Sequence, residues 1–353
     1  MISCRAAIFL AWCCILNIRA RRAGVRSGAI EAENAAGLEA SDVALPFVDL
    51  LVIIPSTVKE TEKRIAIRHS WGKYVDLEGH CERCRSNRTI KILFGVARPE
   101  GEDRSIENET EIFQDLALLN LDQQADHYRK LTLKVRSCIE YAVQHFRFSL
   151  LLKVDTDSFI FMDRFLLLAE KKKLFGQEFG NPTNIYGGKF LHNHKPNASL
   201  ASKWTDRTYS KLTGLEYFPA YAHGAGYILS PSLCRYIAEG LSEHAAKSDA
   251  WAAFPELQPL PNEDVSVGFW LQPVVHTKVE LPISEFPRGC RDGRKIIDHH
   301  VMPKLMNLRW KNLEETGDPC NKAAKQEEIF EDISASKRDE LDYTQMKLDD
   351  DES

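Results

Sequence analysis

The chain has 353 residues, of which 44% are hydrophobic and 27% charged. This composition excludes a collagen, a low-complexity polymer and a fully disordered chain. The formal net charge of −5 argues against a nucleic-acid binder, because such proteins carry a basic surface. Residues 326–353 hold eleven acidic and three basic residues, so the rest of the chain is slightly basic.

The N-terminal segment is apolar from Ala6 to Ile18 and is followed by arginines. A helix of this length spans about 20 Å, which is short of the ~30 Å hydrocarbon core of a membrane. We therefore expect residues 1–18 to be a signal peptide or a short signal-anchor. An ordinary buried helix is the alternative. Residues 19–46 show no periodicity and are expected to form a stem or linker.

Six of the nine cysteines lie beyond the leader, and this even number fits disulfides in an oxidising compartment, with the pairing left open. Cys81 and Cys84 have the spacing of a zinc or redox pair. Because no second close Cys/His pair completes a zinc site, a disulfide or free thiols are favoured. Three glycosylation sequons agree with the secretory pathway: Asn87, Asn108 and Asn197.

Strands and helices alternate along the central part of the chain. Continuous apolar runs predict buried strands at Phe47–Ile54, Ile90–Ala97 and Phe148–Val154. Helices are predicted at Lys59–Trp71, Asp126–Phe146 and Met162–Leu174. This alternation predicts an α/β fold with a mainly parallel sheet covered on both faces. We expect the folded domain to span residues 47–320 and residues 321–353 to form an acidic, solvated tail.

Two acidic residues follow the third predicted strand directly, as Asp155-Thr156-Asp157. Ligands of parallel sheets bind at the carboxyl ends of the strands, so this is the first place to expect a site. Two carboxylates at this spacing can share one divalent cation, which a sugar-nucleotide diphosphate needs as its leaving charge develops. The alternative is a loop that merely contains two acids.

A second acidic pair, Glu263 and Asp264, opens the predicted helix Val265–Leu271. A carboxylate at a helix N-terminus suits a general base that deprotonates a hydroxyl, although acids are also ordinary helix caps. Gly224 and Gly226 lie in a loop where small residues would let a ligand approach the backbone, or simply form a turn. Arg64 and Arg68, one helical turn apart, could clamp a diphosphate or be ordinary surface residues.

Taken in order, these segments resemble the β-1,3-glycosyltransferases of family 31. The motifs that carry the resemblance are Arg64–Trp71, Ile92–Gly95, Asp126–Lys134, Lys153–Phe159, Phe218–Tyr227 and Glu263–Gly268. The resemblance covers the region from Phe47 to Cys320. It implies a GT-A-type, Rossmann-like domain and a metal-dependent inverting transferase that uses a UDP-sugar.

Within the family, the chain is similar to the linkage-region β-1,3-galactosyltransferases of glycosaminoglycan synthesis. The likeness rests on residues 262–270, 288–290, 299–300 and 312–317. It implies UDP-galactose as donor, a galactosyl-xylosyl acceptor on a proteoglycan core protein, and a single-pass type II protein of the Golgi membrane with a luminal catalytic domain. The alternatives are transfer of GlcNAc or GalNAc, another acceptor, or a non-catalytic relative that binds glycans.

The resemblance also implies roles for individual residues. Asp155 and Asp157 would hold Mn²⁺ and the UDP-sugar, with His299 as a further metal ligand and Asp264 as the general base. The substrate-binding residues would be Arg68, Trp71, Lys134, Asp155, Gly224, Gly226 and Glu263. Thr156 departs from the family pattern, in which three acids stand in a row.

Overall fold

The computed structural model describes residues 45–321, apart from residues 77, 82–83, 85, 99–102, 122–129, 176–183, 198–204, 207–208, 241–258, 288–289 and 291. The expected leader (1–18) lies outside the described residues, as do nearly all of the expected linker (19–46) and acidic tail (321–353). Within the described part, no helix has both the length and the hydropathy needed to cross a membrane.

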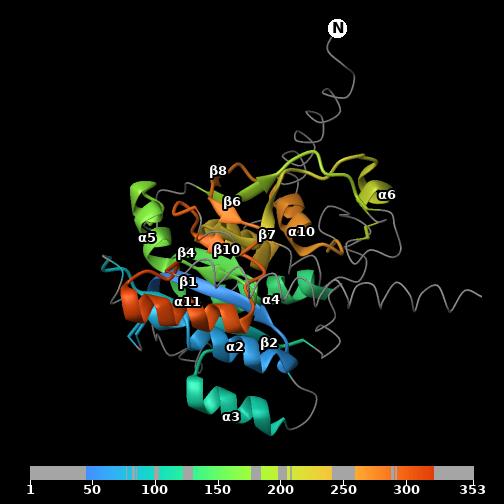
Figure 1. Cartoon of the computed structure of the whole chain (residues 1–353). Coiled ribbons are helices and arrows are strands. Elements are labelled where there is room, and N and C mark those ends of the chain that lie inside the picture. The colour runs from blue at the N-terminus through green and yellow to red at the C-terminus, as the bar shows by residue number, and fades with distance from the viewer. Residues whose placement is uncertain are drawn as a thin grey trace, which may run out of the picture. The chain divides into compact units, whose positions relative to one another are not determined.

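The centre of the domain is a seven-stranded sheet in the order β3-β2-β1-β4-β7-β6-β8 (Figure 1). The strands are β1 (Phe47–Ser56), β2 (Ile90–Ala97), β3 (Leu116–Leu119), β4 (Arg147–Val154), β6 (Ile185–Leu191), β7 (Tyr221–Leu229) and β8 (Thr277–Glu280). β7 runs antiparallel to both of its neighbours, and the other neighbouring pairs are parallel. The predicted α/β fold with a mainly parallel sheet is confirmed.

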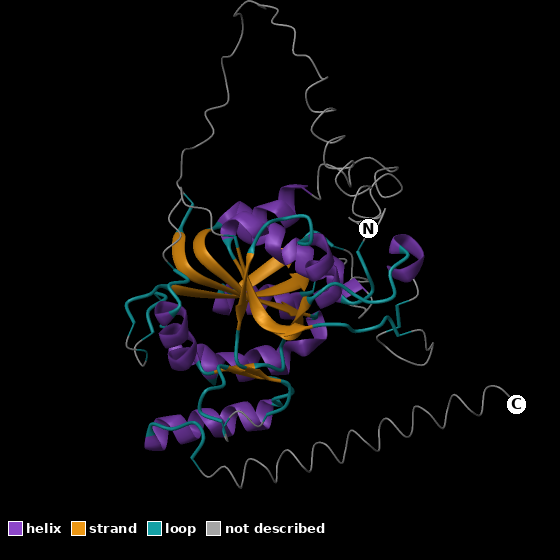
Figure 2. Cartoon of the chain, turned by 90° about the horizontal axis from the view of Figure 1, so that it is seen from above, coloured by secondary structure: helices purple, strands orange, loops and turns teal. Residues whose placement is uncertain are grey.

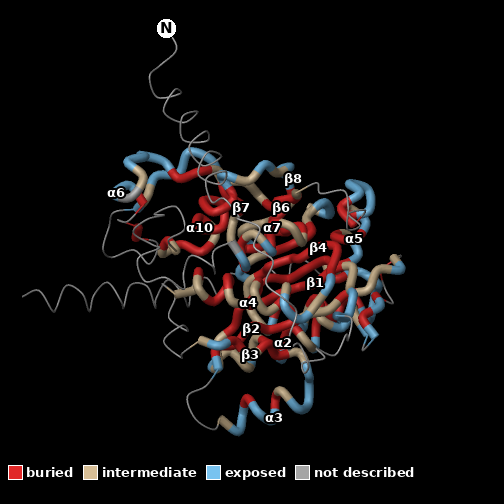
Figure 3. Tube along the Cα trace, turned by 180° about the vertical axis from the view of Figure 1, so that it is seen from behind, coloured by how far each residue is buried: buried red, intermediate tan, exposed pale blue. Residues whose placement is uncertain are grey.

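Helices cover both faces of this sheet (Figure 2). One face packs against α2 (Thr61–Arg68), α5 (Met162–Lys171) and α11 (Pro303–Thr316), and the other against α4 (Leu131–His145), α7 (Pro231–Arg235) and α10 (Glu263–Trp270). Successive residues of a strand point to opposite faces, so Val52 joins the first core and Ile53 the second. Figure 3 shows the result, with central strands such as β1 and β4 largely buried. This two-sided burial explains why the strands are continuous apolar runs.

The remaining elements lie around this core. They are α3 (Arg104–Phe113), α6 (Tyr209–Thr213), the 3₁₀ turns Val58–Glu60 and Trp71–Tyr74, and the π-helical turn Tyr236–Gly240. A small second sheet has the order β5-β10-β9, with β5 (Phe159–Ile160), β9 (Ile283–Ser284) and β10 (Ile297–Asp298). β10 therefore brings the C-terminal part of the domain next to the residues that follow β4.

The predicted strands are confirmed, and the predicted helices exist with other bounds. The predicted helix Val265–Leu271 begins two residues earlier, at Glu263, and ends at Trp270. α2 ends at Arg68 rather than Trp71, because the Ser70 hydroxyl takes over the carbonyl of Ala66 at 2.6 Å. α5 ends at Lys171, and Lys173 follows in the left-handed region at a φ of 54°. α4 begins at Leu131, and the predicted residues 126–129 before it lie outside the described part.

The cysteine expectation is confirmed in part. Disulfides join Cys81 to Cys84 and Cys290 to Cys320, so the first pair is a disulfide rather than a zinc site. Cys138 and Cys234 are buried free thiols in the second core, so the even set of six is not fully paired. Burial raises the pKa of Cys138 to about 12, which leaves it an inert apolar side chain.

Candidate active site

A cavity of about 660 Å³ lies at the carboxyl ends of β1 and β4. Its wall includes Ser56 at the end of β1, the segment Asp155–Asp157 after β4, and Asp264 at the start of α10. The volume falls in the range of about 300–1,000 Å³ that is usual for small-molecule sites. The expectation that ligands bind at the strand ends, directly after β4, is in agreement with this position.

The segment Asp155–Asp157, called the acidic turn below, is a tight turn whose two ends are fixed. The Ser158 amide donates to the Asp155 carbonyl at 3.1 Å, and the Ser158 hydroxyl donates to the Ala225 carbonyl in β7 at 2.9 Å. The indole of Trp71 donates to the Ser158 carbonyl at 2.9 Å from inside the core. Both carboxylates therefore face the cavity on a turn that is held from behind.

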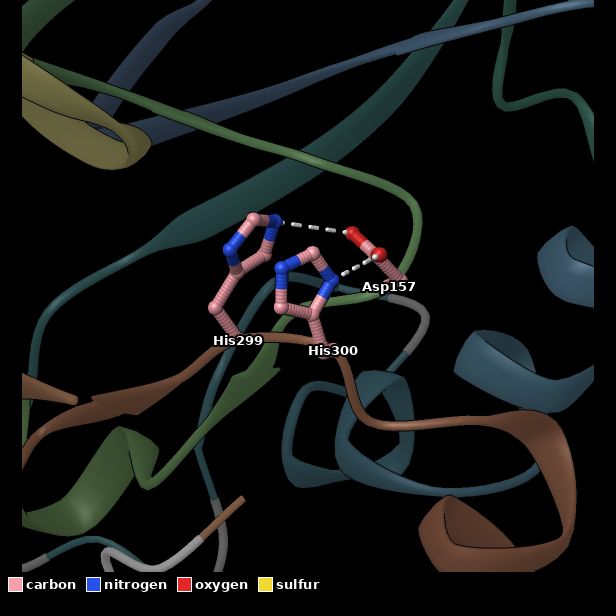
Figure 4. A group of neighbouring side chains, drawn as sticks. All are labelled: Asp157, His299 and His300. Carbon is pink, nitrogen blue, oxygen red and sulfur yellow. Dashed lines mark hydrogen bonds and ion pairs between the residues drawn. The ribbon is translucent and has the colours of Figure 1, made fainter. Parts of the chain in front are cut away.

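Two histidines from the C-terminal part of the domain face this turn (Figure 4). His299 Nε2 lies 3.1 Å from Asp157 Oδ1 and 3.4 Å from Asp155 Oδ2, and His300 Nδ1 lies 3.2 Å from Asp157 Oδ2. Both rings reach the same side because His300 adopts a left-handed conformation at a φ of 58°, which stacks the rings with centroids 3.9 Å apart. This conformation is uncommon for residues other than glycine, although histidine adopts it more often than most.

The arrangement favours positive charge between the carboxylates. Burial alone would lower the pKa of His299, but hydrogen bonds to Asp155 and Asp157 and their charges raise it to about 9. The pKa of Asp157 is correspondingly well below its usual range despite burial, because both imidazoles donate to it. Asp157, His299 and His300 each offer an atom within 4.8 Å of the others. Carboxylate oxygens with imidazole nitrogens are a donor set that fits Mn²⁺ and other divalent transition metals.

Lys153 connects the segment Asp155–Asp157 to the rest of the cavity wall. Its ammonium is fully buried and donates to Asp155 Oδ1 at 2.7 Å, to the Gly224 carbonyl at 2.8 Å and to Glu263 Oε2 at 3.1 Å. All three protons of the ammonium are thus used. Burial would lower the pKa of Lys153, but the charges of Asp155 and Glu263 raise it above its usual value, so it stays charged.

Asp264 stands on the other side of the Gly224 peptide. The Gly224 amide donates to Asp264 Oδ2 at 3.1 Å, and the Val265 amide donates to Oδ1 at 2.9 Å. Burial and the nearby charge of Glu263 raise the pKa of Asp264 to about 7. A carboxylate with that pKa is well matched to accept a proton near neutral pH. A Cβ at Gly224 would lie 3.4 Å from Asp264 Oδ2, which is an ordinary contact distance.

Two more of the expected substrate-binding residues line the cavity with their polar ends engaged by the protein. Glu263 accepts hydrogen bonds from Lys153 and from the Tyr227 hydroxyl, and burial raises its pKa. Lys134 is 2% exposed and donates to the Ser56 carbonyl at 2.8 Å. In this structure both residues hold the wall in place.

Three other expected residues do not line the cavity among the described part of the chain. The guanidinium of Arg68 lies 2.7 Å from Asp115 and 2.8 Å from Glu109, and Trp71 supports the acidic turn from the core. Gly226 lies where β7 packs against β10, and a Cβ there would come within 2.8 Å of Ile297 Cδ1. Close packing, rather than ligand approach, requires that glycine.

The structure adds residues that the sequence analysis did not single out as site residues. Glu60 and Lys63 come from the turn and helix after β1, and Thr156 donates to Glu60 Oε1 at 3.1 Å. Lys63 Nζ donates to the same oxygen, Glu60 Oε1, at 2.6 Å. The sequence could have indicated Glu60 and Lys63, because they follow β1, and the carboxyl ends of the neighbouring parallel strands β1 and β4 meet at the same edge of the sheet. Lys153 was also visible, as the one charged residue near the end of an apolar run.

Comparison with known families finds a match to the galactosyltransferase family model over residues 62–281. The chain is 27% identical over 282 residues to hydroxyproline O-galactosyltransferase GALT6 of Arabidopsis thaliana, covering 78% of this chain and 36% of the relative. It is 27% identical over 233 residues to UDP-GalNAc:beta-1,3-N-acetylgalactosaminyltransferase 2 of Xenopus laevis, covering 66% of this chain and 42% of the relative. The chain thus spans about two fifths of the length of these curated relatives.

Similar solved structures include the galactosyltransferase LgtC, with a TM-score of 0.39 and 8% identity over 72% of this chain and 87% of that one. Mouse xyloside xylosyltransferase 1 is similar with a TM-score of 0.35 and 9% identity, over 72% of this chain and 97% of that one.

Proposed function

The chain belongs to the galactosyltransferase family, and we propose that it is an inverting β-1,3-galactosyltransferase. In this proposal it moves galactose from UDP-galactose to a galactosyl-xylosyl acceptor in the linkage region of proteoglycan glycosaminoglycans. The observation that supports the proposal is one cavity lined both by side chains that could hold a cation, Asp157, His299 and His300, and by a carboxylate whose pKa is raised to about 7, Asp264.

The chemistry follows from these positions. Asp264 accepts the proton of the acceptor 3-hydroxyl, and that oxygen attacks the anomeric carbon of the donor from the side opposite UDP. The bond to the diphosphate oxygen breaks as the new bond forms, so the α-linked donor gives a β-linked product. Mn²⁺ held by Asp155, Asp157 and His299 would neutralise the charge on the departing diphosphate. Lys153 and the Gly224 peptide keep the base and the acidic turn at a fixed separation.

The choice of acceptor is supported by the sequence resemblance over residues 262–270, 288–290, 299–300 and 312–317. The choice of donor has a specific rival, because one of the relatives is named as a UDP-GalNAc transferase. We also propose that residues 47–320 form the catalytic domain and that it faces the Golgi lumen, anchored by residues 1–18. The disulfide between Cys290 and Cys320 supports an oxidising compartment.

A donor panel tests the proposal. The purified full-length chain is incubated with Mn²⁺, a β-1,4-galactosyl-xyloside and UDP-galactose, UDP-GalNAc, UDP-GlcNAc or UDP-glucose, and both UDP release and the product linkage are measured. Transfer from UDP-galactose alone, lost with a chelator and in Asp264→Ala, is the expected result. Transfer from UDP-GalNAc alone would replace the donor, and a folded protein that binds UDP without turnover would favour a non-catalytic glycan-binding role.

A further inference from the structure

We propose that Arg309, on the C-terminal helix α11, is a positioning residue that fixes His299 and His300 against the acidic turn. The inference rests on the proposed function, because it takes the cation site as given. Arg309 and its partner Asp298 both lie beyond the residues that the family model matches, which end at 281. Neither residue is among the described residues that line the cavity, so any role they have in the site is indirect.

Arg309 and Asp298 form an ion pair inside the core. Arg309 Nη2 lies 2.8 Å from Asp298 Oδ2, and both side chains have 0% exposure. The same nitrogen donates to the Pro287 carbonyl at 3.0 Å. The coulombic attraction within a buried ion pair is largely offset by the free energy of desolvating the two charges. An apolar pair of similar volume often stabilises the fold equally well. What this pair adds is a directional link between two particular elements.

Those elements lead directly to the two halves of the cation site. Asp298 ends β10 and immediately precedes His299, while Phe159 begins β5, two residues after Asp157. Asp298 and Phe159 face each other in the antiparallel register of the small sheet, and the guanidinium of Arg309 lies 5.1 Å from the Phe159 ring centroid. Arg309 therefore touches both strands at the points where they enter the site.

The histidine segment is held at its other end as well. The Val301 amide donates to the Asp157 carbonyl at 2.8 Å, so the two histidines lie between the Arg309 contact and this hydrogen bond. α11 itself is a firm support, because Leu305, Met306 and Trp310 are buried in the first core. With both ends fixed, the segment that carries the left-handed His300 and the stacked rings is held against the carboxylates.

The experiment measures Mn²⁺ affinity directly, from the electron paramagnetic resonance signal of the free aquo ion, at a temperature where every variant is folded. Arg309→Met is expected to raise the Kd for Mn²⁺ by about 10–100-fold, the range seen when an outer-shell partner of a metal ligand is lost. Arg309→Lys keeps the charge without the planar fork and should restore part of the affinity.

A double variant separates positioning from stability. Asp298→Leu with Arg309→Met replaces the ion pair by an apolar pair, which should keep the unfolding temperature near that of the wild type. The double variant is nevertheless expected to bind Mn²⁺ as weakly as Arg309→Met. The matched control is Asp115→Asn, which removes the carboxylate that accepts two hydrogen bonds from Arg68, at 2.8 and 2.7 Å. This control should lower stability and leave the Kd for Mn²⁺ within about twofold.

Three results would overturn the proposal, and they differ. Wild-type affinity in both Arg309→Met and the double variant would show that Arg309 does not position the histidines. An equal loss of affinity in Asp115→Asn would show that general loosening of the fold is enough. Both of these results leave the cation site of the proposed function standing. A wild-type protein that binds no Mn²⁺ would instead overturn that site, and this inference with it.

Discussion

The two sides of the cavity are held in place by different parts of the molecule. Glu263 and Asp264 are tied by hydrogen bonds, through Lys153 and the Gly224 peptide, to the central strands β4 and β7. The histidines follow the two-residue strand β10 and depend on α11. The first side lies inside the family match and the second lies beyond it. The comparison indicates that the proposed base is fixed by charges buried in the main sheet, whereas the residues of the proposed cation site come from two separate sheets.

The largest expected effect tests the side of the cavity that carries Glu263 and Asp264, called the base side here. Asp264→Asn keeps the size of the side chain and one of its two acceptor oxygens but cannot take a proton. We expect kcat to fall by about 10²–10⁴-fold, the usual contribution of a general base. Steady-state kinetics give kcat, and calorimetry should show unchanged Mn²⁺ and UDP binding, because the hydrogen bonds described for Asp264 come from the backbone amides of Gly224 and Val265. A kcat within threefold of the wild type would remove Asp264 from the mechanism.

The next prediction concerns the link between the base and the sheet. Lys153→Met leaves Asp155 and the buried Glu263 without their shared cation, and should lower the free energy of unfolding by about 3–5 kcal/mol. Urea denaturation measures this change. Lys63→Met is the matched control, since Lys63 pairs with Glu60 at the surface with 34% of its side chain exposed and should cost under about 1 kcal/mol. Equal losses in the two variants would contradict the role assigned to Lys153.

The pH dependence of kcat/KM tests the role of Asp264 on the base side more closely. In the proposed mechanism Asp264 works only when deprotonated, and its pKa is raised to about 7 by burial and by Glu263. The value of kcat/KM should therefore rise about tenfold per pH unit below pH 7 and level off above it. A profile with its midpoint near pH 4, the region of an ordinary aspartate, would show that the surroundings do not tune this carboxyl. Stopped assays at constant ionic strength from pH 5 to 9 give the profile.

The smallest expected effect lies on the acidic turn. Thr156→Val removes the hydrogen bond from Thr156 to Glu60 and should lower the free energy of unfolding by about 0.5–1.5 kcal/mol. Thr156→Ser keeps the hydroxyl and should retain most of that stability. Urea denaturation distinguishes the two variants, and a loss in Thr156→Ser without a loss in Thr156→Val would show that the methyl group of Thr156, not its hydroxyl, is what matters.

Much of the base side could be predicted from the sequence. Apolar runs fixed the strands, and parallel strands place their carboxyl ends at one edge, so Asp155 and Asp157 were expected in a ligand site. The hydrophobic periodicity of the sequence could not show which partners the long charged side chains find in the folded protein. Arg68 was expected near the nucleotide, but the carboxylates of Asp115 and Glu109, more than forty residues along the chain, hold it elsewhere.

The side of the cavity that carries His299 and His300 was harder to predict from the sequence. The resemblance implied His299 as a ligand, but two-residue strands such as β10 have no readable pattern, and Asp298 and Arg309 look like ordinary surface residues in the sequence. Their pairing depends on where α11 packs, which is a tertiary property. The role of Gly226 was hidden for the same reason, since the side chain it makes room for, Ile297, comes from β10.

The tuned carboxyl of Asp264 also affects how this protein responds to selection for heat resistance. Its pKa is about 7 in the fold against an ordinary value of 3.8, so folding opposes its ionisation. The protein therefore gives up stability as the pH rises from about 4 through 7, and Asp264→Asn avoids that loss. A thermostability screen run at pH 8 would enrich replacements at Asp264 and so collect robust but inactive variants. The same screen at pH 5 would favour them much less.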